Sequence, residues 1–159
     1  MSTEKPQIDR DLAHRHFSSG CFNHTWTLIE KQDRTPADDE AMVLCALASL
    51  WHWTQRPDCT ERNLSIGHWQ ISRVYALTGQ GESAMTHARK CVEHAAGSPP
   101  FYIGYGHEAA ARAALVLGDV ASFREYLDKA HALAAQVEDV DERTPLEDDI
   151  RDLEERARP

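Results

Sequence analysis

Two stretches of the chain, 39 residues apart, share one pattern. The segments GHWQISRVYALTGQGESAMTHARKCVEHA and GHEAAARAALVLGDVASFREYLDKAHALA both begin with Gly-His, at His68 and at His107. Each segment predicts a helix, a tight turn that contains glycine, and a second helix with small residues on its inner side. One such hairpin cannot bury its own apolar face, so neighbouring hairpins must stack against each other.

Residues that favour helix starts predict where the other helices begin. In DRTPADDEAM, Thr35 is expected to cap a helix and Pro36 to occupy its first position, where no N–H is needed. Ser98-Pro99, after a stop at Gly97, and Thr144-Pro145 predict two more starts of this kind, whereas Ser18-Ser19-Gly20 predicts a bend or break in the first helix. No stretch alternates like a strand, so we predict an all-α protein. About seven helices are expected, at 8–32, 36–56, 60–79, 81–96, 99–117, 120–137 and 144–157.

Short connections imply that successive helices form antiparallel hairpins within a single domain spanning 1–159. Residues 1–7 are expected to be flexible. The helix 144–157 has a narrow apolar stripe and is otherwise strongly charged, so we predict that it caps one end of the stack. The stripe consists of Leu146, Ile150 and Leu153.

The two hairpins resemble the tetratricopeptide repeat over about residues 65–135. The small and bulky positions of that family are matched by Ser72, Tyr75, Ala84, Ala88 and Cys91, and then by Ala111, Ala114, Phe123, Leu127 and Ala130. The resemblance implies a right-handed stack of antiparallel hairpins, an α-solenoid. His68 and His107 depart from the family, because they stand at its tryptophan position. The chain is also similar to small bacterial proteins with Trp- and His-rich helices, a likeness that implies no activity.

The charge balance excludes some partners. Seventeen Lys and Arg residues face 26 Asp and Glu, for a formal net charge of −9. The phosphate attraction that drives nucleic-acid binding is therefore missing, and neither nucleic acid nor an anionic membrane is an expected partner. The N-terminal segment has no apolar run typical of a secretion signal, which predicts a cytoplasmic location.

Metal and cofactor motifs are not expected. The four cysteines contain no C-x-x-C pair, and the chain has no phosphate-binding loop or dinucleotide fingerprint. His87, Cys91 and His94 follow at i, i+4 and i+7, which places three potential ligands on one helical face. Since Cys91 falls at a small buried position of the repeat, the sequence favours no metal site and no cofactor.

A binding site is predicted around two i, i+4 pairs. Trp69 with Arg73 and, 39 residues later, Glu108 with Arg112 would line the concave groove that the tetratricopeptide resemblance implies. Two arginines at equivalent positions would project side by side and clamp a carboxylate or phosphate, with Trp69 as an apolar wall. In the alternative interpretation the arginines bridge acidic residues of adjacent helices and Trp69 belongs to the core.

The sequence thus predicts a non-catalytic interaction module that binds a peptide, a protein tail or a small carboxylated ligand. His52 and Trp53 are expected at the edge of its groove. Two alternatives stay open. The aromatic-rich surface could form a homodimer interface, or His52, His68 and His107 could converge as the acid–base groups of an enzyme.

Overall fold

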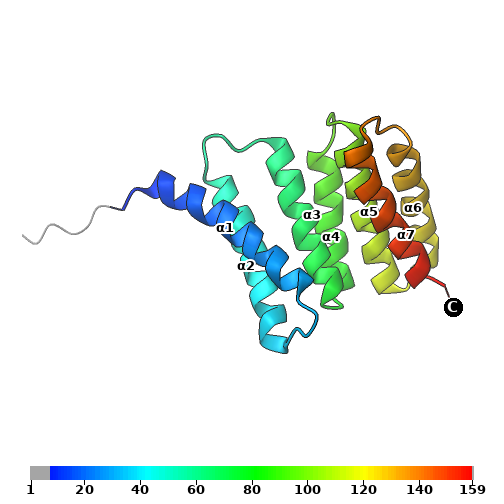
Figure 1. Ribbon diagram of the computed structural model, residues 1–159, viewed down its shortest axis with the longest axis horizontal. Coiled ribbons are helices and arrows are strands. Elements are labelled where there is room, and N and C mark those ends of the chain that lie inside the picture. The colour runs from blue at the N-terminus through cyan, green and yellow to red at the C-terminus, as the bar shows by residue number, and fades with distance from the viewer. Residues whose placement is uncertain (1–7, 159) are drawn as a thin grey trace, which may run out of the picture.

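The computed structural model describes residues 8–158, and these contain seven helices and no strand (Figure 1). The helices are α1 (Arg10–Glu30), α2 (Pro36–Thr54), α3 (Glu61–Leu77), α4 (Gly81–His94), α5 (Pro100–Leu117), α6 (Val120–Ala134) and α7 (Val140–Arg156). The all-α prediction is confirmed, and each expected helix has a counterpart. The expected flexibility of residues 1–7 concerns a segment outside the described residues. None of the described helices combines the length and the apolar character needed to cross a bilayer.

Capping boxes start α2 and α3. The Thr35 hydroxyl accepts a hydrogen bond from the Asp38 N–H at 3.2 Å, and the Asp38 carboxylate accepts one from the Thr35 N–H at 2.8 Å. Pro36 occupies the first helical position, and Thr60 with Asn63 forms a second capping box. These bonds satisfy N–H groups that have no partner inside the first turn. The predicted start at Thr35 and Pro36 is confirmed.

Glycine turns of one geometry follow α3 and α5. Gly79 and Gly118 have φ of +76° and +71°, a left-handed conformation that only glycine adopts without strain. After each glycine, the next N–H donates to the carbonyl five residues before it. Gln80 N–H donates to Tyr75 at 2.8 Å, and Asp119 N–H donates to Ala114 at 3.0 Å. Each turn reverses the chain into the second helix of a hairpin.

The start of α5 is shifted by one residue from its prediction. Gly97 has φ +79°, as a left-handed stop requires, but Ser98 does not cap the helix. Pro99 stands at the N-cap position and Pro100 is the first helical residue. Either proline could fill the first position, because neither offers an N–H, and the sequence signal did not distinguish them.

The start of α7 was predicted wrongly. Asp139 is the N-cap, and its carboxylate accepts a hydrogen bond from the Asp141 N–H at 2.8 Å, so that the helix begins at Val140. Thr144 and Pro145 therefore lie inside α7 instead of starting it. Asp139 also places its charge at the positive end of the helix dipole, which favours the earlier start.

The sequence predicts that the first helix bends or breaks at Ser18-Ser19-Gly20. The predicted break is absent, because α1 is one continuous helix from Arg10 to Glu30. Ser18 is fully buried, and its carbonyl accepts a hydrogen bond from the Ser49 hydroxyl at 2.7 Å. Its own hydroxyl accepts one from Arg56 Nη1 at 2.9 Å. These contacts with α2 and the segment after it hold a stretch whose helix propensity is low.

The helices lie side by side in chain order, as hairpins α1/α2, α3/α4 and α5/α6, and α7 packs on α5 and α6 (Figure 1). α3 also packs on α2, and α5 packs on both α3 and α4. α1 packs closely on α2 but not on α3. Side chains of α1, α3, α5 and α7 border a cavity that α2 and α6 do not line.

The core has two parts. The larger part joins α3 to α7 and is rich in alanine, so that these helices approach closely. The smaller part joins α1, α2 and α3 through Leu28, Met42, Ala46, Leu50, Ile71 and Val74. The apolar stripe of α7 is fully buried in the larger part, at Leu146, Ile150 and Leu153.

Candidate functional site

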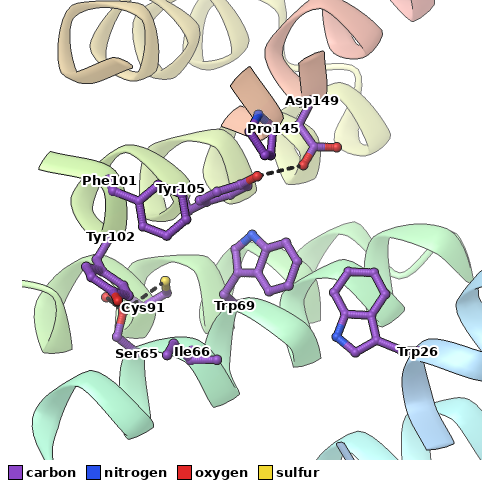
Figure 2. Close-up of a pocket in the computed structure, with 10 residues that line it drawn as sticks. All are labelled: Trp26, Ser65, Ile66, Trp69, Cys91, Phe101, Tyr102, Tyr105, Pro145 and Asp149. Carbon is purple, nitrogen blue, oxygen red and sulfur yellow. Dashed lines mark hydrogen bonds between the residues drawn. The ribbon is translucent and has the colours of Figure 1, made fainter. Parts of the chain in front are cut away.

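An aromatic pocket of about 490 Å³ opens in the space bordered by α1, α3, α5 and α7 (Figure 2). It is lined by Trp26, Ser65, Ile66, Trp69, Cys91, Phe101, Tyr102, Tyr105, Pro145 and Asp149. Of these, Cys91 alone comes from an even-numbered helix, α4. The volume falls in the range of sites that hold a small molecule or a side chain with its neighbours. We call this cavity the aromatic pocket.

A chain of ring contacts forms its wall. Trp26 on α1 lies 5.6 Å from Trp69 on α3, measured between ring centroids. Trp69 meets Tyr105 of α5 edge to face at 5.4 Å, and Tyr105 meets Phe101 at 5.1 Å. Such distances and tilts are the favourable ones for aromatic pairs. The wall therefore links three helices that are far apart in the sequence.

A buried carboxylate fixes the orientation of Trp69. Glu108 has no exposed surface, and its Oε2 accepts a hydrogen bond from Trp69 Nε1 at 3.3 Å. Its Oε1 accepts hydrogen bonds from Arg112 Nε at 2.9 Å and from Arg73 Nη1 at 3.4 Å. Because the indole N–H is already bonded inside the protein, Trp69 offers its apolar ring to the pocket.

Asp149 on α7 closes the network at the pocket. It accepts hydrogen bonds from Arg73 Nη2 and from the Tyr105 hydroxyl, both at 3.2 Å, and lies 3.8 Å from Arg112 Nη2. Burial raises the pKa of Tyr105 well above its ordinary value, and the negative charges of Asp149 and Glu108 add to this effect. Tyr105 therefore stays a neutral hydrogen-bond donor.

Arg73 and Arg112 do lie together, as the repeat spacing suggested, but both bind carboxylates of the protein. Besides Glu108 and Asp149, the pair contacts Asp152, which lies 3.6 Å from Arg112 Nη1. These contacts are the ones foreseen in the alternative interpretation. Asp152 also accepts a hydrogen bond from Arg156 Nε at 2.8 Å. Three cations thus meet three carboxylates, and the charges of the cluster balance. A clamp for an external carboxylate stays a prediction, and it would require Arg73 or Arg112 to exchange a partner.

The predicted site residues lie in three places: at the aromatic pocket, in a second cavity, and between α1 and α2. Trp69 lines the aromatic pocket, while Glu108 and Arg112 are buried behind it and Arg73 is mostly buried beside them. Trp53 lines a separate cavity of about 230 Å³ and stacks under a guanidinium, that of Arg56, at 3.8 Å.

His52 lies outside the aromatic pocket as well. Its Nδ1 is 2.8 Å from Nδ1 of His14, in the hairpin α1/α2. Neither His52 nor Trp53 lines the aromatic pocket. Ile66 lines both this pocket and the cavity at Trp53, and so connects the two.

Several residues that line the aromatic pocket are not among the site residues predicted from the sequence. Phe101, Tyr102 and Tyr105 come from the segment FYIGY, whose spacing of i, i+1 and i+4 was a signal for an aromatic helix face. Asp149 lies in an acidic run that is typical of a solvated surface. Trp26 gave no signal, because its position depends on how α1 docks.

His52, His68 and His107 do not meet in one site. His52 contacts His14, His107 stacks on Tyr126 at 6.1 Å, and His68 has its Nδ1 2.9 Å from that of His87. The three candidates thus lie in three different hairpins with different partners, which contradicts the alternative in which they converge.

The potential metal ligands of α4 have other partners. The Cys91 thiol lies 3.4 Å from the Ser65 hydroxyl, and burial raises its pKa to about 11. His94 Nδ1 lies 2.7 Å from the Glu61 carboxylate. Within residues 8–158, no three or more His, Cys, Asp or Glu side chains are grouped so that they could hold a metal ion.

Comparison with protein-family models, with curated proteins and with solved structures found no match for this chain.

Proposed function

We propose that the chain is a non-catalytic binding module, and that its aromatic pocket holds an aromatic or large aliphatic side chain of a peptide or protein tail. The observation that carries the proposal is the set of five aromatic rings around a cavity of about 490 Å³. The rings are those of Trp26, Trp69, Phe101, Tyr102 and Tyr105. Burial of apolar surface against them supplies the driving force for binding.

The polar groups favour a neutral anchor. Trp69 Nε1 and the Tyr105 hydroxyl already donate to carboxylates of the protein, to Glu108 and to Asp149. The arginines of the charged cluster behind the pocket are already paired with Glu108, Asp149 and Asp152. A carboxylated ligand would therefore gain little from them. For this reason we favour an uncharged anchor over the small acidic ligand that the sequence also allowed.

The origin of the lining residues supports a groove of the tetratricopeptide type. In that family the first helix of each hairpin lines the concave face. Nine of the ten lining residues here belong to α1, α3, α5 and α7, the odd-numbered helices. A right-handed stack of hairpins, with α7 as its cap, is therefore part of the proposal.

Titration with N-acetyl-tryptophanamide tests the proposal, with the four indole N–H signals followed by NMR. At about −0.3 kcal/mol per non-hydrogen atom, a probe of roughly 18 such atoms would bind with a Kd on the order of 0.1 mM. We expect two indole signals to shift, those of Trp26 and Trp69. Tyr102→Ala should weaken binding at least about fivefold, because the ring is lost from the wall. Tyr126→Ala, which removes a half-buried tyrosine outside the pocket, is the matched control and should bind normally.

N-acetyl-tryptophan, which carries a free carboxylate, separates the two anchors. Weaker binding of this acid than of the amide would support a neutral anchor. Tighter binding that is lost in Arg73→Ala would instead establish the carboxylate clamp and overturn the neutral-anchor proposal. Shifts that are equal in wild type and Tyr102→Ala, or the absence of shifts with both probes, would refute the pocket as a binding site.

A further inference from the structure

α2 is apolar on its outward side as well as on its inward side. Its segment Ala41–Thr54 contains no Asp, Glu, Lys or Arg. The inward residues are buried in the smaller part of the core. On the opposite side Leu44, Leu47 and Trp51 are 58%, 36% and 56% exposed. A helix that is hydrophobic all round is normally covered on all sides.

The exposed apolar surface continues onto α1. The Trp51 ring packs against His52 and against His14 of α1, with centroid distances of 4.8 and 5.5 Å. Phe17, which is 47% exposed, packs on the other side of His52 at 5.3 Å. We call Phe17, Leu44, Leu47 and Trp51 the outer patch.

The two ends of the row of helices differ in character. At one end α7 buries its apolar stripe completely and turns charged side chains outward, such as Asp148, Arg151 and Glu155. At the other end α2 presents the outer patch. In a protein of net charge −9, this uncharged segment is a place where two copies can approach without repulsion between like charges.

We propose that the outer patch pairs with the outer patch of a second copy, with the two α2 helices antiparallel across a two-fold axis near Leu47. The spacing of the exposed residues along α2 favours a second copy as the partner. Leu47 lies midway in a stripe whose ends are Leu44 and Trp51, three and four residues away. An antiparallel two-fold pairing therefore places Leu44 of one copy against Trp51 of the other, and Leu47 against its equivalent. The surface is complementary to itself, which a two-fold interface requires.

The size of α2 sets the strength of the pairing. Its 19 residues span about 28 Å, and two such faces would bury on the order of 500 Å² per copy. A stable complex typically buries about 800 Å² per partner, so the dimer is expected to be weak, with a Kd on the order of 10 to 100 µM. The monomer and the dimer should both be populated at accessible concentrations.

Sedimentation equilibrium of the full chain over roughly 1 to 300 µM tests the proposal. Wild type should shift from monomer to dimer across this range. Leu44→Glu/Trp51→Glu should stay monomeric, with its Kd raised at least about tenfold, because it places like charges opposite apolar groups. Val140→Glu is the matched control, since Val140 of α7 is 57% exposed and lies outside the patch, and it should dimerise like wild type.

A wild-type protein that stays monomeric throughout would overturn the proposal. So would a dimer that persists in the double variant or that is lost in the Val140 control. Circular dichroism should show unchanged helicity in both variants, because all three positions are exposed.

Cross-linking tests the antiparallel geometry directly. Leu47→Cys places a thiol beside the proposed two-fold axis, so mild oxidation at about 100 µM protein should link two copies through this position. The bond would be identified by mass spectrometry of the linked peptide, because four native cysteines are also present. Val140→Cys should give no such product. Failure of Leu47→Cys to cross-link more than the control would overturn the proposed pairing. None of these results depends on the aromatic pocket.

Discussion

Glu108 accepts hydrogen bonds from two arginines and an indole, although its side chain has no exposed surface. Removing a carboxylate from water costs several kcal/mol, which only close partners can offset. Arg112 and Arg73 are such partners, and the same carboxylate fixes the ring of Trp69. Stability and the shape of the aromatic pocket are therefore linked through this residue.

Glu108→Ala should lower the free energy of unfolding by about 3 to 5 kcal/mol, because it leaves Arg112 buried without its nearest partner. Urea unfolding followed by circular dichroism measures the change. Glu125→Ala serves as control, since Glu125 forms an exposed i, i+4 pair with Lys129 and its removal should change stability by less than about 0.5 kcal/mol. Similar losses in the two variants would contradict the role assigned to Glu108.

The hairpin α3/α4 is joined by a pair of histidines. His68 Nδ1 lies 2.9 Å from His87 Nδ1, so one ring must donate and the other must accept, and at least one of the two rings must be neutral. Burial lowers the pKa of His68 to about 4, and the positive charges of His87, His94 and Lys90 act in the same direction. Burial also lowers the pKa of His87. Packing of the hairpin therefore favours the neutral form of both rings.

This pair predicts a loss of stability in mild acid. A histidine in the unfolded chain titrates near 6.5, so below that pH the unfolded state binds more protons than the folded state. Stability should be fully present above about pH 6.5 and should fall as the pH drops towards 4, by up to about 1.4 kcal/mol per pH unit for each such proton. Urea midpoints at a series of pH values measure this slope. His68→Gln should have a shallower slope than wild type, and an unchanged slope would exclude the pair as its cause.

The smaller part of the core connects the N-terminal hairpin to the rest of the row through α3. α1 buries Ser18, Thr25 and Leu28 and packs closely on α2, whereas α5 contacts α3, α4, α6 and α7. The contacts between α1 and α3 depend on side chains. Gln70 Nε2 donates to the carbonyl of Phe22 at 3.1 Å, and Trp26 meets Trp69.

Amide hydrogen exchange should therefore show α1 opening before α5. We expect peptides from α1 to exchange about 30-fold faster or more, which corresponds to roughly 2 kcal/mol less opening free energy. Mass spectrometry of peptides from both helices measures the difference at a single protein concentration. Equal protection of α1 and α5 would show that the molecule opens as one unit and would contradict this prediction.

Local sequence signals were sufficient for most helices and failed where two signals competed. Thr35 and Pro36 were identified correctly because a capping box depends on four adjacent residues. Thr144 and Pro145 match the same signal, yet Asp139 starts α7. Once the chain enters the helix at Asp139, packing of Leu146, Ile150 and Leu153 holds it across the proline, and no local pattern reports that packing.

The sequence by itself determined the seven helices and their inward faces, because these follow from periods of a few residues. It also placed Trp69, Arg73, Glu108 and Arg112 together, because the two pairs are offset by 39 residues. The tertiary structure alone decided that the arginines bind Glu108 and Asp149, and that Trp26 faces Tyr105 across Trp69. Such contacts join α1, α3, α5 and α7, and they depend on how distant helices dock. Docking is set by the summed packing of all the helices, which local spacing does not encode.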